Sequence, residues 1–162
     1  MTTPYAELHC LSNFTFLRGA SHPEELVQQA ADLGYQALAL TDECSFAGVV
    51  CAHRAIKEEN LSLKLIIGSE FTLTEGIRLV ALVPNREAYG ELSGLISRAR
   101  RRSGKGEYRV HLRDVIFHLK RCLLILLPND TENETVHLQQ LARRCKGRVW
   151  IGISRLLGND EW

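Results

Sequence analysis

Imidazole and carboxylate side chains recur in this sequence at points where predicted strands end. His9 lies at the end of the first such strand, Asp42 and Glu43 directly follow the second, and Glu70 follows the third. Neutral nitrogen combined with anionic oxygen is the donor set that holds a hydrolytic divalent cation while water stays bound. These four residues are therefore a candidate metal site. The alternative is that they cap or hydrogen-bond the strand ends as ordinary structural residues.

These side chains can meet only if the strands that carry them are neighbours. Strand-like and helix-like segments alternate along the chain, which is typical of α/β folds with a largely parallel sheet. In such folds the carboxyl ends of the strands converge on one rim, where functional residues collect. We predict strands at 5–10, 37–41, 63–68, 123–127 and 148–153, helices at 21–34, 46–59, 85–101, 112–119 and 132–145, and a hairpin extension formed by 70–74 and 77–83.

Two of these helices carry start signals that can be read from single residues. Ser21-His-Pro-Glu24 has the spacing of a capping box with proline in the first turn, and Gly34 ends the same helix. Asn85 is a typical N-cap for the helix that runs to about Arg101. We therefore expect the first helix to be capped by Ser21.

Composition places the chain among ordinary globular domains. It has 162 residues, of which 45% are hydrophobic and 24% charged, with 20 Lys and Arg against 19 Asp and Glu. These figures exclude a disordered, collagen-like or polybasic protein. The five cysteines are odd in number and scattered, which indicates reduced thiols of a cytoplasmic protein rather than a disulfide framework or a zinc finger. The N-terminus has no signal peptide pattern, and no apolar run is long enough to span a bilayer.

Three ordered motifs lie in the first 70 residues: the run from Glu7 to Ser21, Ala39-Leu-Thr-Asp-Glu-Cys44 and Ile66-Ile-Gly-Ser-Glu70. They resemble, in order and spacing, the opening of the polymerase and histidinol phosphatase (PHP) domain. More narrowly, residues 5–52 are similar to the version at the N-terminus of C-family bacterial DNA polymerases, in the error-prone, damage-induced branch. The resemblance implies an incomplete, distorted seven-stranded β/α barrel of the TIM-like PHP type. Residues 1–162 would form a single N-terminal domain that is truncated before the last barrel units.

The comparison with metal-binding members of that family indicates what this chain has lost. They begin with His-x-His, of which His9 is kept while the second histidine is replaced by Leu11. Replicative relatives commonly have Leu-Leu-Asp-Gly where this chain has Phe-Leu-Arg-Gly, so that Arg18 replaces a carboxylate. The Thr-Asp-His of the family is Thr-Asp-Glu here, which puts Glu43 in place of a histidine, and Glu70 of the Gly-x-Glu motif is retained.

These replacements suggest that an internal ion pair has taken the place of the metals. Arg18, set among Asp42, Glu43 and Glu70, would neutralise carboxylates that cations otherwise balance. We therefore expect either no tightly bound cofactor or one residual divalent ion, Mn, Zn or Mg, held by the remaining ligands. The alternative for Arg18 is a side chain that points into solvent.

A second cluster of interest is basic. Arg98, Arg101, Arg102 and Lys105 lie at the end of a predicted helix and in the glycine-containing loop that follows. Such a cluster could contact a phosphate backbone. The alternative is a solvated loop whose positive charges complement the negative end of the helix dipole.

Three functions remain open. The resemblance favours the PHP domain of an error-prone DNA polymerase in damage-induced translesion synthesis, with a degenerate metal site and a mainly structural role. Its parent would be a DNA-directed DNA polymerase, a nucleotidyltransferase. The partners would then be the polymerase core of the same longer chain and, through it, DNA, with no membrane involved. The alternatives are a metal-dependent phosphoesterase or 3′–5′ exonuclease, and a standalone interaction module.

Overall fold

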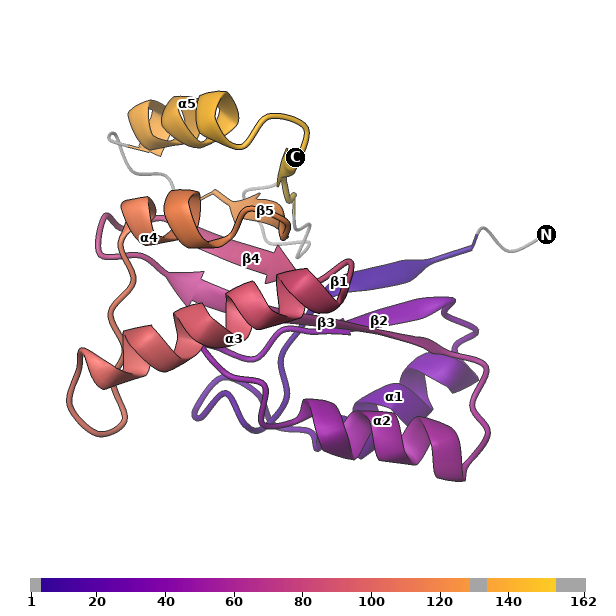
Figure 1. The fold of residues 1–162 in the computed structure, drawn as a ribbon. Helices are drawn as coiled ribbons and strands as arrows, with labels where there is room; N and C mark the ends of the chain where they lie inside the picture. The colour runs from indigo at the N-terminus through magenta and orange to yellow at the C-terminus, as the bar shows by residue number, and fades with distance from the viewer. Residues whose placement is uncertain (1–3, 129–133, 154–162) are drawn as a thin grey trace, which may run out of the picture.

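The computed structural model describes residues 4–128 and 134–153. Within these ranges, strands and helices follow one another along one curled sheet (Figure 1). Residues 132, 133 and 156–162, on which part of the expected organisation falls, lie outside the described residues. The elements are β1 (Ala6–Cys10), α1 (Pro23–Asp32), β2 (Ala37–Leu40), α2 (Val49–Glu58), β3 (Lys64–Thr72), β4 (Arg78–Leu82), α3 (Arg86–Arg101), α4 (Leu112–His118), β5 (Leu123–Leu127), α5 (Glu134–Arg144) and β6 (Val149–Ile151).

The sheet is ordered as the chain is, from β1 to β6. β1, β2 and β3 pair in parallel, β4 is antiparallel to both β3 and β5, and β5 pairs in parallel with β6. The expected alternation of strands and helices and the α/β class are confirmed. Of the described strands, β4 alone runs against the others.

The predicted hairpin is confirmed, because residues 70–72 pair antiparallel with residues 78–80, but its place as an extension of the sheet is wrong. Residues 70–72 continue β3 instead of starting a new strand, and β4 lies in the middle of the sheet, between β3 and β5. The turn before β4 uses Gly76 at φ +83°, a conformation that favours glycine. Four of the five β4 residues, from Leu79 to Leu82, are buried, so this strand needs neighbours on both edges and cover on both faces.

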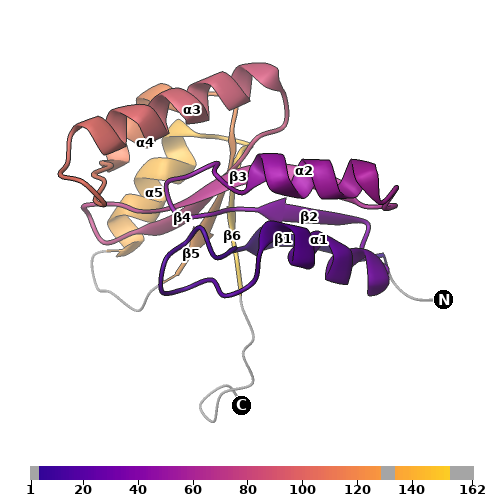
Figure 2. The same ribbon diagram turned by 90° about the horizontal axis from the view of Figure 1, so that it is seen from below.

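Both faces of the sheet are apolar, because successive residues of the strands point to opposite sides. In β4, Leu79 packs in the core beneath α3 and α4, whereas Val80 faces the other side. In β2, Leu38 packs against α1 and α2, whereas Ala39 joins Val80. Figures 1 and 2 show α1 and α2 together at one end of the molecule and α3, α4 and α5 at the other. The helices therefore lie on the outside, and the curled sheet has an apolar inner face.

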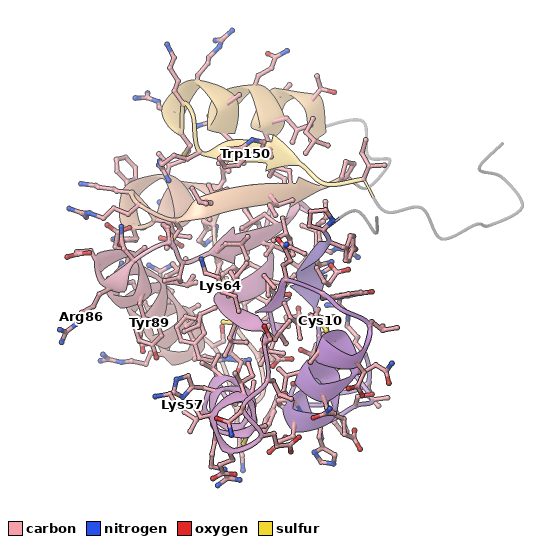
Figure 3. The ribbon with its side chains drawn as sticks, turned by 90° about the vertical axis from the view of Figure 1, so that its right-hand side faces the viewer. Cys10, Lys57, Lys64, Arg86, Tyr89 and Trp150 are labelled. Carbon is pink, nitrogen blue, oxygen red and sulfur yellow. The ribbon has the colours of Figure 1, made fainter. Side chains whose placement is uncertain are left out.

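The inner face is not fully covered in the described part of the chain. A hollow of about 490 Å³ lies between β1 and β6, lined among others by Tyr5, Leu82, Ile125 and Trp150. Trp150, which Figure 3 labels on β6, is 50% exposed. The described sheet is a half-barrel. The expectation of an incomplete seven-stranded barrel stays a prediction, since six strands are described.

The start of α1 differs from the expected cap by one residue. Its N-cap is His22, whose backbone N–H donates to Glu25 Oε2 at 2.8 Å, and Pro23 occupies the first helical position. Ser21 lies outside because its carbonyl accepts a hydrogen bond from the Asn13 backbone N–H at 2.9 Å. The Asn85 cap of α3 is confirmed, since its side chain accepts from the Ala88 N–H.

Two further sequence expectations concern membranes and disulfides. Among the described residues, no helix combines the length and the apolar character that crossing a bilayer needs. All five cysteines carry free thiols.

The close packing of β3 against β4 gives a direct test of this fold. A Cβ at Gly68 would lie 2.8 Å from the Ala81 carbonyl oxygen, so Gly68→Ala should lower the free energy of unfolding by about 1–3 kcal/mol. At Gly90, on the outer face of α3, a Cβ would meet nothing within 4 Å, and Gly90→Ala should raise it by about 0.5–1 kcal/mol. Urea denaturation of both variants measures the effects. Shifts of the same sign would contradict the β3–β4 register.

Candidate functional site

The site is presented by the loop of residues 11–20, which folds back after β1. The Thr15 carbonyl accepts hydrogen bonds from the backbone N–H groups of Arg18 at 3.1 Å and Gly19 at 2.9 Å. A Cβ at Gly19 would lie 1.9 Å from the Ser12 carbonyl oxygen, so only glycine fits there. Leu17 adopts φ +65°, which is strained for a leucine. The loop is thus tightly wound, and it directs Arg18 to the ends of β2 and β3.

Arg18 bridges two carboxylates. Its Nη1 donates to Glu43 Oε2 at 2.9 Å and to Glu70 Oε1 at 2.7 Å. The other oxygen of Glu70, Oε2, lies 2.5 Å from His9 Nε2. Arg78, from β4, adds a third nitrogen, its Nε, at 3.9 Å from Glu70 Oε1. Glu70 is fully buried, whereas the side chains of Arg18 and His9 are partly exposed.

The surroundings of Glu70 decide its charge. Burial alone would raise the pKa of Glu70, but hydrogen bonds and charges from His9 and Arg18 outweigh it and lower that pKa to about 2. Arg18 in turn has its pKa raised, chiefly by the hydrogen bond to Glu70. Both groups are therefore ionised at neutral pH, and the carboxylate lies among basic side chains.

Asp42 lies outside this ion pair, and the expectation that Arg18 contacts it is wrong. Its Oδ1 accepts from the Ser12 backbone N–H at 2.8 Å and from Thr15 Oγ1 at 2.7 Å. Its Oδ2 accepts from Ser12 Oγ at 2.7 Å. All three donors belong to the loop of residues 11–20, so the buried Asp42 carboxylate anchors the loop that carries Arg18.

Glu43 has a partner that the sequence did not point to. Tyr108 donates its hydroxyl hydrogen to Glu43 Oε1 at 2.6 Å and accepts from the Thr72 N–H at 2.8 Å. Burial, followed by the bond to Glu43, raises the pKa of Tyr108 well above its ordinary value. Arg100 lies over the Tyr108 ring at 5.4 Å and donates to the Glu43 carbonyl at 3.2 Å. Residues 100 and 108 follow Glu43 by more than 50 positions, and no local pattern signals these contacts.

The predicted metal ligands are only partly brought together. His9 and Glu70 are in contact, and Glu43 is joined to Glu70 through Arg18. Leu11, in place of a second histidine, is partly buried and offers no donor atom. In residues 4–128 and 134–153, no three side chains of His, Cys, Asp or Glu converge closely enough to hold a metal ion.

The predicted basic cluster is placed by α3 and the turn that follows it. Arg102 pairs with Asp114, with Nη1 at 2.5 Å from Oδ2. No described acidic side chain lies within ion-pair distance of Arg98, Arg101 or Lys105.

The depressed pKa of Glu70 makes stability depend on acid. A carboxylate with a folded-state pKa of about 2 contributes stability above its ordinary pKa of 4.5, and this contribution is lost as pH falls between these values. Glu70→Gln should therefore be less stable than the parent at pH 7 and show a shallower loss between pH 4.5 and 2. Urea midpoints at several pH values measure this. Glu107→Gln, which removes an exposed carboxylate, is the control, and parallel curves for all three proteins would contradict the ion pair.

The chain is similar to known proteins over most of its length. Residues 7–140 match the PHP domain family. The error-prone DNA polymerase of Saccharophagus degradans is 54% identical over 154 residues, which cover 94% of this chain. That of Vibrio vulnificus is 52% identical over 157 residues, or 97% of the chain. The chain spans about 15% of the length of each of these relatives.

Solved structures share the fold at low sequence identity. A putative metal-dependent phosphoesterase from Bifidobacterium adolescentis superposes with a TM-score of 0.66 at 17% identity, over 93% of this chain and 77% of the other. An amidohydrolase from Chromobacterium violaceum gives a TM-score of 0.61 at 16% identity, over 90% of this chain and 75% of the other. The resemblance seen in the sequence motifs is confirmed, and the chain belongs to the PHP domain family.

Proposed function

We propose that this PHP domain is part of an error-prone DNA polymerase and serves it structurally during damage-induced translesion synthesis. The observation that carries the proposal is the Arg18 guanidinium between Glu43 and Glu70. The names of the relatives, and the small share of their length that the chain spans, support a role within a longer polymerase. The partners would be the polymerase core of that chain and, through it, DNA.

The charge balance argues for a structural role. A divalent cation at this position would have to approach Arg18 and Arg78, both of which lie within 4 Å of Glu70. A guanidinium cannot coordinate a cation and stays protonated at any physiological pH. Removing Arg18 would instead take one of its two hydrogen-bond partners from the buried Glu70 carboxylate, which is strongly unfavourable. We infer that the ion pair holds the domain together where other family members hold metal.

Restoring the metal-ligand side chains that this chain lacks tests whether the ion pair has taken the place of a metal. Leu11→His combined with Arg18→Asp supplies an imidazole and a carboxylate next to His9 and Glu70. The double variant should bind about one Mn²⁺ or Zn²⁺ per chain, measured by inductively coupled plasma mass spectrometry after dialysis against each metal. The matched control is Leu33→His with Arg54→Asp, the same changes at exposed positions of the surface.

The parent chain decides between the structural role and a second candidate. Metal content near zero in the parent, with a gain in the double variant, supports the structural role; no gain in the double variant contradicts the exchange. A metal-dependent phosphoesterase or 3′–5′ exonuclease is favoured by the name of one structural neighbour and by the His9–Glu70 contact. That candidate requires stoichiometric metal in the parent and phosphoester hydrolysis that stops on His9→Ala and on chelation.

We further propose that the remaining units of a seven-stranded barrel cover the inner face in the whole polymerase. The apolar hollow beside Trp150 and the exposed Ile153 supports this, because 85% of the Ile153 surface is open to solvent. A longer segment of the polymerase gene product that includes the following barrel units should bind less of the dye ANS per mole than residues 1–162. Equal or greater dye binding by the longer protein would contradict barrel closure.

A further inference from the structure

We propose that the outward face of α3 and α4, with the loop between them, binds the phosphate backbone of a nucleic acid. The charge of the chain is distributed very unevenly. Nine of its 20 Lys and Arg lie between residues 98 and 121, together with only two of its 19 Asp and Glu. The net charge of the whole chain is +1, so this segment is strongly basic and the remainder is acidic. A nearly neutral chain therefore carries a region of positive electrostatic potential at residues 98–121.

The structure separates the basic side chains that have internal partners from those that do not. Arg100 is turned inward to the Glu43 and Cys44 carbonyls. Arg102 pairs with Asp114, and Arg121 pairs with Glu91. Six others have no acidic side chain within ion-pair distance among the described residues: Arg98, Arg101, Lys105, Arg109, Arg113 and Lys120.

The two helices join these cations into one surface. α3 and α4 run antiparallel, since Arg102 contacts Asp114 near one end and Glu91 contacts Arg121 near the other. Figure 1 shows α4 above α3, and both helices pack on the same core cluster. The face therefore receives positive charge from α3, from α4 and from the connecting loop.

A groove of about 440 Å³ runs along the C-terminal half of α3. It is lined by Gly94, Ser97, Arg98, Arg101 and Arg102. A Cβ at Gly94 would meet nothing within 4 Å, so the groove has a low, open floor beside its cations. Protein sites that bind phosphate commonly combine guanidinium donors with a stretch of protein backbone that the phosphate can approach closely.

The charge and composition of the groove favour a phosphate backbone over a protein partner. The centre of a protein interface is usually apolar and depleted of charge, whereas this groove is lined by glycine, serine and arginine. His118 reports the local field: burial and then Arg98 lower the pKa of its imidazole, with Arg102 and Lys120 adding to the effect of Arg98 and Asp114 opposing it. The choice of DNA as the polyanion rests on the proposed function.

Alanine variants of the unpaired basic residues test whether this face binds nucleic acid. Residues 1–162 are titrated into a fluorescein-labelled 20-nucleotide single strand and the corresponding duplex, and anisotropy is recorded from 50 to 200 mM salt. Arg98→Ala, Arg101→Ala and Lys105→Ala together should weaken binding at least tenfold at 50 mM salt and reduce the log–log salt slope by about three. None of these three side chains makes an ion pair among the described residues, and thermal unfolding checks that the variant is folded.

The control removes the same charge elsewhere. Lys57, Lys64 and Lys146 are exposed and lie outside α3 and α4, and their combined change to alanine should alter affinity less than twofold. Figure 3 labels the first two. Equal weakening by both triple variants would overturn the assignment to the α3–α4 face, as would parent-like binding by the first. Displacement of DNA by poly-glutamate at equal charge would overturn the assignment to nucleic acid. None of these results bears on metal binding by the Leu11→His, Arg18→Asp variant, so this inference and the proposed function can fail separately.

Discussion

The structure depends on keeping one carboxylate ionised in a place without solvent. Glu70 is fully buried, and a buried charge is tolerated only when it is paired and hydrogen-bonded. Three different parts of the chain meet this requirement. β1 supplies His9, the loop after it supplies Arg18, and β4 brings Arg78 nearby. The contacts of the Glu70 side chain thus fix how β1, the loop after it and β4 lie relative to one another.

The contacts that surround this carboxylate extend across the molecule. Asp42 fixes the loop that carries Arg18, and Glu43 receives both Arg18 and Tyr108. Through Tyr108 and its neighbour Arg100, the ion pair is tied to the end of α3. Basic residues on that helix thus have two distinct tasks, because one of them turns inward to backbone carbonyls while others face solvent.

The sequence predicted the elements well where local chemistry determines them. Apolar runs located the strands, and the Asn85 cap located α3, because each signal lies within a few residues of the feature it specifies. The placement of β4 was missed, because the sequence of a hairpin does not show whether its second strand lies at the edge of the sheet or between two other strands. Of the site, the motifs identified His9, Arg18, Glu43 and Glu70, but not that Asp42 bonds to the loop instead. The Tyr108 contact spans 65 positions along the chain and has no local signal.

The order of the sheet bears on how the chain acquires its structure. Each described strand pairs with the one that precedes it, so a polypeptide emerging from the ribosome adds every new strand to an edge that is already made. Pairing consecutive strands closes shorter loops than pairing strands from distant parts of the chain would, which lowers the entropic cost of loop closure. When Glu70 is synthesised, His9 and Arg18 have both already been made. The charge can then enter the interior together with its partners, and the domain is suited to co-translational assembly from its N-terminus.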